Sequence, residues 1–279
     1  MLAALTLGAL AAWGFLNYAR DPEPTPEMRG HALAVKLGCH GCHGPRGTGG
    51  VPNPGGQDGH VPAWDGGTAM MFVRNEDEIR EWIMDGKPWR LVLRDSLDAR
   101  RRGDGEAHLR DSFPGPEDAS FHPRPVAPGE LPLKMPAYRE LVSEAELEDL
   151  VAYYQAVADF REMPDDARAG YRAARALGCF GCHGPGGLIG AENPQSFKRY
   201  IPPWRGPDFD ELVKNDDELR SWILDGGIPR VNENRVARFF LSRQVIRMPA
   251  YRGVMADSTL ADIENYIRWL TSDSGARGE

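Results

Sequence analysis

One nine-residue stretch occurs twice in the sequence: residues 37–45 are LGCHGCHGP, and residues 177–185 are LGCFGCHGP. All four cysteines of the chain lie in these two stretches, and a histidine directly follows the second cysteine of each pair. On a helical turn, side chains three positions apart lie on one face, so the two thiols of a pair can face the same group. Each stretch therefore predicts a site that combines two thiols with one imidazole.

The Cys-x-x-Cys-His pattern predicts two covalently attached haem c groups, each with one iron. Each pair of thiols would form thioethers with one haem, and the following histidine would ligate its iron; the residues are Cys39, Cys42 and His43, and Cys179, Cys182 and His183. A structural zinc site and a thioredoxin-like redox pair also use Cys-x-x-Cys. Neither requires the repeated histidine, and zinc would need both pairs to meet in one site.

The two stretches belong to an internal duplication with an offset of 140 residues. The match continues through NEDEIREWIMDG at 75–86 and NDDELRSWILDG at 215–226. It then breaks, and resumes at KMPAYR (134–139) and RMPAYR (247–252). The offset there is 113, so the first copy carries 27 more residues. These extra residues lie within the segment between Lys87 and Lys134, the insertion at 87–134.

Met135 and Met248 are the predicted second axial ligands of the two irons. In each MPAYR segment the proline removes a backbone donor and stiffens the loop, which can hold a thioether sulfur toward iron opposite the histidine. The alternative is an ordinary core role, which suits the methionines that lack a matched partner or lie on helical patterns: Met70, Met71, Met84 and Met255.

Helical signals dominate both copies, and no strand pattern of comparable strength is present. Asn75 and Asn215 are candidate N-caps before acidic first turns, and Gly86 and Gly226 stand where those helices would end. Near the end of each copy, apolar residues recur at helical spacing; they are Leu147, Leu150, Tyr153, Tyr154 and Val157, and Leu260, Ile263, Tyr266, Ile267 and Leu270. Ser143 and Glu146 form a predicted capping box.

Composition indicates a water-soluble body of two domains. The chain has 279 residues, 41% hydrophobic and 27% charged, and its 32 glycines and 23 prolines predict many turns and loops. The net charge of −8 excludes a nucleic-acid partner of the usual kind, because no basic stripe is present to neutralise phosphates.

Residues 1–19 carry no charged side chain and end at Arg20. As a helix they would span roughly 28 Å, close to the hydrocarbon thickness of a bilayer, so they predict one membrane crossing. A cleaved signal peptide is the alternative, although the basic n-region and a clear small-residue cleavage site are missing.

The order of motifs resembles the class I cytochrome c family: CxxCH early in the unit, Met-Pro-Ala-Tyr late, then an amphipathic helix. The resemblance covers almost the whole chain after residue 22, twice. It implies an all-α fold of two tandem cytochrome c domains, each wrapped around a haem, in which the first helix crosses the last at Gly30 or Gly170. It also implies that the loops at 53–54 and 193–194 orient the histidines, and that Trp64 and Trp204 lie near haem propionates.

The expected organisation is therefore a membrane anchor (or signal segment) at 1–20, a first domain at 22–162 and a second domain at 165–273. We expect a carrier of single electrons and not an enzyme, as a subunit of a respiratory or photosynthetic complex with a membrane-bound redox complex or other cytochromes as partners. A dihaem peroxidase or thiosulfate-oxidising enzyme is the alternative. Because haem is attached after export, residues 1–19 would cross the bacterial cytoplasmic membrane and leave the haem domains on the periplasmic side.

The insertion at 87–134 is predicted to dock a partner subunit. Its first part, 89–102, mixes apolar residues with arginines and could form a short amphipathic helix. Its second part, 113–132, holds six prolines and predicts an extended segment without a core of its own. The alternative is a loop that only covers the edge of the first haem.

Overall fold

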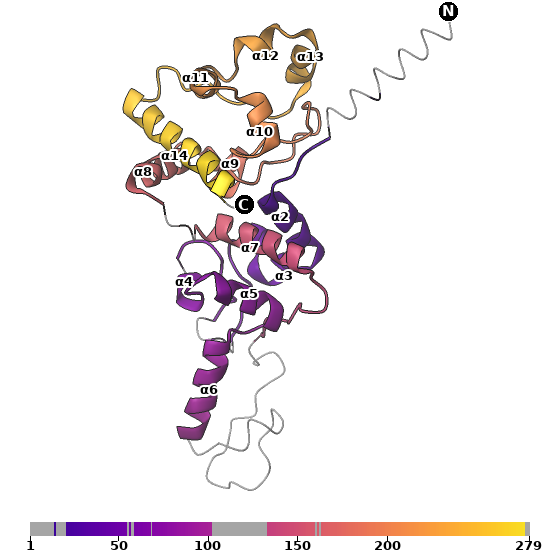
Figure 1. The fold of residues 1–279 in the computed structure, drawn as a ribbon, viewed down its shortest axis with the longest axis vertical. Helices are drawn as coiled ribbons and strands as arrows, with labels where there is room; N and C mark the ends of the chain where they lie inside the picture. Colours follow the sequence, from indigo (N-terminus) through magenta and orange to yellow (C-terminus); the bar gives the residue numbers. More distant parts are fainter. Residues whose placement is uncertain are drawn as a thin grey trace, which may run out of the picture. The chain divides into compact units, whose positions relative to one another are not determined.

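The computed structural model describes residues 14, 21–54, 56, 59–67, 69–101, 133–159, 161 and 163–276, and this part of the chain is mostly helical (Figure 1). Pairing between extended segments is limited there to two isolated bridges, Pro52 with His60 and Glu192 with Tyr200. The all-α prediction is therefore confirmed. Within the described residues no helix is long and apolar enough to span a membrane; the predicted anchor, 1–19, lies outside them except for Gly14.

The chain divides into two compact units. The first unit is Arg29–Asp159, and the second is Phe160–Glu279 together with Met1–Met28. Residues just before Arg29 fold with the second repeat: the backbone N–H of Glu23 donates to Asp208 (3.1 Å), and Arg205 donates to the buried carboxylate of Glu27. The sequence repeat alone places these residues at the start of the first domain.

The helices follow the duplication. From Arg29 onward the first unit contains most of α2 (Pro26–Lys36), then α3 (His40–His43), η1 (Pro45–Gly47), α4 (Ala69–Phe72), α5 (Glu76–Asp85), α6 (Trp89–Arg101) and α7 (Glu144–Ala158). The second contains α8 (Asp165–Ala176), α9 (Phe180–His183), η2 (Pro185–Gly187), α10 (Pro207–Leu212), α11 (Asp216–Asp225), α12 (Pro229–Glu233), α13 (Arg235–Arg243) and α14 (Asp257–Ala276).

The predicted helix ends are confirmed by their hydrogen bonds. The side chain of Asn75 accepts from the backbone N–H of Glu78, and Asn215 does the same at the start of α11. Both helices end at a glycine in the left-handed conformation, with φ of 72° at Gly86 and 69° at Gly226. The capping box of α7 is present as well. Local chemistry thus sets the bounds of these helices.

A glycine lies at a helix crossing in each unit, as the family resemblance implies. A Cβ built on Gly30 would lie 1.9 Å from the carbonyl oxygen of Asp149 in α7, and one on Gly170 would lie 2.0 Å from that of Asp262 in α14. Figure 1 shows α8 and α14 side by side. All ten apolar residues that predicted α7 and α14 are buried. These two helices therefore form the core of their units.

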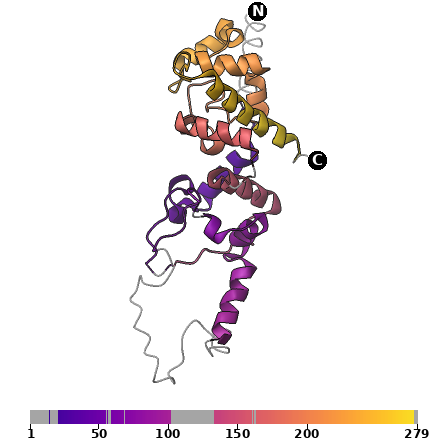
Figure 2. The same cartoon turned by 90° about the vertical axis from the view of Figure 1, so that its left-hand side faces the viewer.

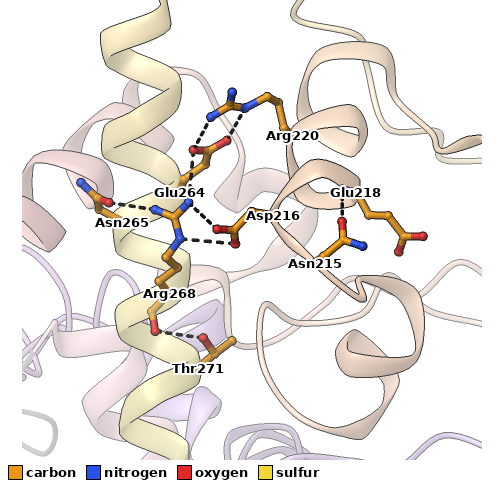
Figure 3. A network of polar contacts seen from close by, with 8 residues as sticks. All are labelled: Asn215, Asp216, Glu218, Arg220, Glu264, Asn265, Arg268 and Thr271. Carbon is orange, nitrogen blue, oxygen red and sulfur yellow. Dashed lines mark hydrogen bonds and ion pairs between the residues drawn. The ribbon is translucent and has the colours of Figure 1, made fainter.

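Charged side chains tie α11 to α14 (Figure 3). Arg220 donates two hydrogen bonds of 3.0 Å to Glu264, whose side chain is 2% exposed, and Arg268 bridges Glu264 and Asp216. Because a buried carboxylate without a partner is costly, these arginines fix the register of the two helices.

The start of the insertion forms α6, so the helix predicted at 89–102 is confirmed over Trp89–Arg101. It extends away from α5 and α7 in both views (Figures 1 and 2) and exposes Trp89, Leu93 and Leu97. The proline-rich part, 113–132, lies outside the described residues.

Candidate haem sites

Both Cys-x-x-Cys-His motifs form a single helical turn. The backbone N–H groups of Cys42 and His43 donate to the carbonyl of Cys39 (3.3 and 3.0 Å), and the second motif repeats this pattern at 3.2 and 3.0 Å. The four cysteines are free thiols. Burial raises the pKa of Cys39 and of Cys179, so both thiols are protonated near neutral pH.

A backbone carbonyl orients each predicted histidine ligand. The Nδ1 atom of His43 lies 2.9 Å from the carbonyl oxygen of Pro62, and that of His183 lies 3.1 Å from the oxygen of Pro202. A ring N–H that donates to this carbonyl leaves Nε2 free for a metal. Burial lowers the pKa of His183 to about 4 and that of His43 below its usual value. Both imidazoles are therefore neutral, the form that ligates iron.

A tryptophan packs against each of these histidines. The ring of Trp64 lies 4.9 Å from that of His43, and the ring of Trp204 lies 5.0 Å from that of His183, measured between centroids. Gly47 and Gly187 lie close against the tryptophan rings, where a Cβ would approach within 2.4 Å. The tryptophans thus restrict the rotation of the two histidine rings. That Trp64 and Trp204 lie near haem propionates stays a prediction.

The two methionine segments are held in the same way against the ends of α5 and α11. The backbone N–H of Tyr138 donates to the carbonyl of Ile83 (3.1 Å), and that of Tyr251 donates to Ile223 (3.2 Å). The carbonyl of Met248 also passes so close to Gly226 that a Cβ there would lie 2.6 Å from its oxygen. The αL glycine therefore ends the helix and makes room for the methionine segment.

The buried asparagines at 53 and 193 hold the chain just before the methionines. Asn193 accepts hydrogen bonds from the N–H groups of Val245 and Ile246 (3.2 and 3.3 Å) and donates to the carbonyl of Ile246 (2.9 Å). Asn53 accepts from the N–H of Leu133 (2.8 Å). The hydrogen-bond partners of the histidines are the proline carbonyls, so these asparagines act on the methionine side of the site.

In the second unit, one cavity of about 520 Å³ is lined by all four predicted ligands and attachment residues: Cys179, Cys182, His183 and Met248. Most of the remaining wall is apolar and aromatic, including Trp204, Phe209, Ile223 and Phe240. Its volume lies in the range of pockets that hold cofactor-sized molecules, about 300–1,000 Å³. This wall suits a large apolar ring, to which the two thiols of the wall could attach.

The first unit differs from the second beside the motif, where His31 and His40 stand in place of Tyr171 and Phe180. The Nε2 atom of His40 lies 3.0 Å from the hydroxyl oxygen of Tyr153, and the rings of His31 and His40 are 5.6 Å apart. No group of three or more His, Cys, Asp or Glu side chains in the described parts of either unit could hold a metal ion. These histidines pack locally.

A matched ion pair shows that the repeat keeps its register beyond residue 86. Arg90 makes two hydrogen bonds to Glu78 (2.6 and 3.0 Å), and Arg230, 140 positions later, makes two to Glu218 (2.8 and 2.9 Å). Sequence comparison missed this match because the residues around the arginines differ. The pairs anchor the segment after α5 or α11 in both units.

Comparison with family models, curated protein sequences and solved structures found no match to this chain.

Proposed function

We propose that this chain is a dihaem c-type cytochrome that carries single electrons, with one haem c attached in each unit. Cys39 and Cys42 would hold the first haem, with His43 and Met135 on its iron; Cys179 and Cys182 would hold the second, with His183 and Met248. The observation that carries the proposal is the cavity of the second unit, whose wall contains both thiols, the neutral imidazole and the methionine.

The bound haem would supply a one-electron couple. The residues of this chain would hold the iron ligands in position. The carbonyls of Pro62 and Pro202 orient the imidazoles. Asn193 and Tyr251 fix the backbone that carries Met248. With a histidine and a methionine of this chain as ligands, the iron would have no open position, and the methionine thioether would raise its potential. This supports electron transfer over a peroxidase or a thiosulfate-oxidising enzyme, in which one ligand must be exchangeable.

We further propose that residues 1–19 remain attached and anchor the chain in the bacterial cytoplasmic membrane, with both units on the periplasmic side. The absence of charge over these residues supports a membrane crossing, and haem attachment after export would place both units on the periplasmic side. The chain would then serve a membrane-bound respiratory or photosynthetic complex. Fractionation should recover it in membranes with its N-terminal peptide intact by mass spectrometry; a soluble periplasmic product that starts near residue 20 would contradict the anchor.

The haem assignment is tested on the purified full chain by haem content and by axial ligation. We expect two covalent haems per chain and the weak near-infrared band of sulfur-ligated ferric haem. Met135→Ala and Met248→Ala should each remove part of this band. Met70→Ala is the control, because Met70 is 64% exposed and has no matched partner in the repeat. A spectrum that is unchanged in both ligand variants would exclude His/Met ligation.

A further inference from the structure

Helix α13 forms one wall of the cavity in the second unit and also has an exposed face. Val236, Ala237, Phe240 and Leu241 line the cavity. On the outer side the ring of Phe239 is 52% exposed, and the guanidinium of Arg243 lies over it at 4.4 Å from its centroid. The outer face of the helix therefore covers the site that we assign to the second haem.

The surface around this helix is strongly basic in an acidic protein. Residues 230–252 contain six arginines and a single acidic residue, while the whole chain carries a net charge of −8. Arg230 and Arg252 are paired with Glu218 and Asp225. The other four arginines are exposed, and none of them forms an ion pair within the described parts of the chain; they are Arg235, Arg238, Arg243 and Arg247.

We propose that this surface, formed by Arg235, Arg238, Phe239, Arg243 and Arg247, docks the acidic face of a redox partner protein directly over the cavity of the second unit. The proposal rests on the proposed function and names the partner of that site by its chemistry. An exposed aromatic ring flanked by arginines has the composition of a protein interface hot spot. Unpaired arginines would steer a partner that carries carboxylates and set its orientation.

An acidic protein fits this surface better than an anionic membrane. A helix that lies in a membrane interface needs a broad apolar face for the lipid. The apolar side chains of α13 line the cavity instead, and only Phe239 and Val236 are about half exposed on the helix. The helix has nine residues, so a wider lipid-facing side is not available to it.

The test uses the full haem-loaded chain and an acidic flavodoxin as the probe protein, with the dissociation constant measured by calorimetry at low and moderate salt. We expect binding that weakens about tenfold or more as salt rises. The double charge reversal Arg235→Glu/Arg238→Glu should weaken low-salt binding at least tenfold and flatten the salt dependence. Phe239→Ala should weaken binding without changing that dependence.

The matched control is Arg172→Glu/Arg175→Glu, which makes the same change in charge at two exposed arginines of α8 in the same unit. This control should stay within about twofold of the unmodified chain, since its arginines lie on α8 and outside the proposed docking surface. Equal weakening by both double variants would mean that only net charge matters, and would overturn the docking surface.

Vesicles with anionic phospholipids form the second arm of the test. Vesicle binding that only the α13 reversal abolishes, with flavodoxin binding unchanged, would assign the surface to a membrane and overturn the proposal. Covalent haem content is measured on every sample. A chain without haem overturns the proposed function and this inference with it, whereas a haem-loaded chain on which both double variants bind alike overturns the docking surface alone.

Discussion

The crossing of α8 and α14 at Gly170 gives a prediction that does not depend on the cofactor. A Cβ at this position would lie 2.0 Å from the carbonyl oxygen of Asp262 and 2.6 Å from the Cβ of Tyr266, while ordinary contacts begin near 3.4 Å. In Gly170→Ala the helices must therefore separate by about 1.4 Å. Neither contacting atom is the end of a flexible side chain, so rotation cannot relieve the clash.

The cost follows from what the crossing buries. Ile263, Tyr266 and Leu270 of α14 are at most 2% exposed, and separation of the helices loosens all three. Overpacking of a dense core costs about 1–3 kcal/mol, and we expect the upper end here because backbone must move. The better helix propensity of alanine returns about 1 kcal/mol. Gly170→Ala should therefore destabilise the second unit by about 2 kcal/mol.

Urea unfolding, followed by circular dichroism, measures this loss. With a slope of about 2 kcal/mol per molar urea, the midpoint of the second unit should fall by about 1 M. Gly30→Ala should do the same to the first unit, since its Cβ would lie 1.9 Å from the carbonyl oxygen of Asp149. Gly181→Ala is the control, because nothing lies within 4 Å of its Cβ. A Gly170→Ala chain that unfolds with the control would refute the argument.

Two further predictions concern polar contacts that support the sites. Asn193→Ala leaves the N–H groups of Val245 and Ile246 without their acceptor. If both haems are bound as we propose, added imidazole should therefore displace Met248 more readily than Met135 in this variant. Equal displacement at both irons, measured by absorbance titration, would contradict this. Arg230 lowers the pKa of Glu218 to about 2, so the pair stabilises the fold fully above the unfolded pKa of about 4.3 and loses this effect as the pH falls toward 2. Arg230→Gln should lower the free energy of unfolding at pH 7 and flatten its decline between about pH 4.3 and 2. Urea unfolding of the variant and the unmodified chain across that range measures this. An equal decline in the two chains would contradict the role of the pair.

Local signals allowed the helix ends and the terminal helices to be predicted. An asparagine before an acidic turn and a glycine after the last turn act within a few residues, so Asn75, Gly86 and their counterparts could be identified from the sequence alone. The helical spacing of apolar residues likewise predicted the buried faces of α7 and α14. The duplication identified Met135 and Met248 as the candidate ligands, because it showed which of the nine methionines recur at matched positions.

Contacts between distant residues could not be predicted in this way. Asn193 holds residues more than 50 positions later, and the proline carbonyls that orient the histidines are backbone groups without a side-chain signature. The resemblance assigned the asparagine loops to the histidines, but the hydrogen bonds connect these side chains to the methionine segments. The packing of residues 21–28 with the second unit was also missed, because Glu27 has no local feature that points to Arg205.

The two units differ mainly in the segment between their matched arginines and their methionines. Up to that point they share the same supports: capped α5 and α11, the Glu78–Arg90 and Glu218–Arg230 pairs, and proline carbonyls behind the histidines. Beyond it, the first unit has the rest of α6 with exposed Leu93 and Leu97, and the second has the basic helix α13. Shared supports would give both irons the same ligands, whereas these different helices give the units different outer surfaces. If both units carry haem, a partner can therefore recognise one unit over the other by its surface charge, without any difference in ligation.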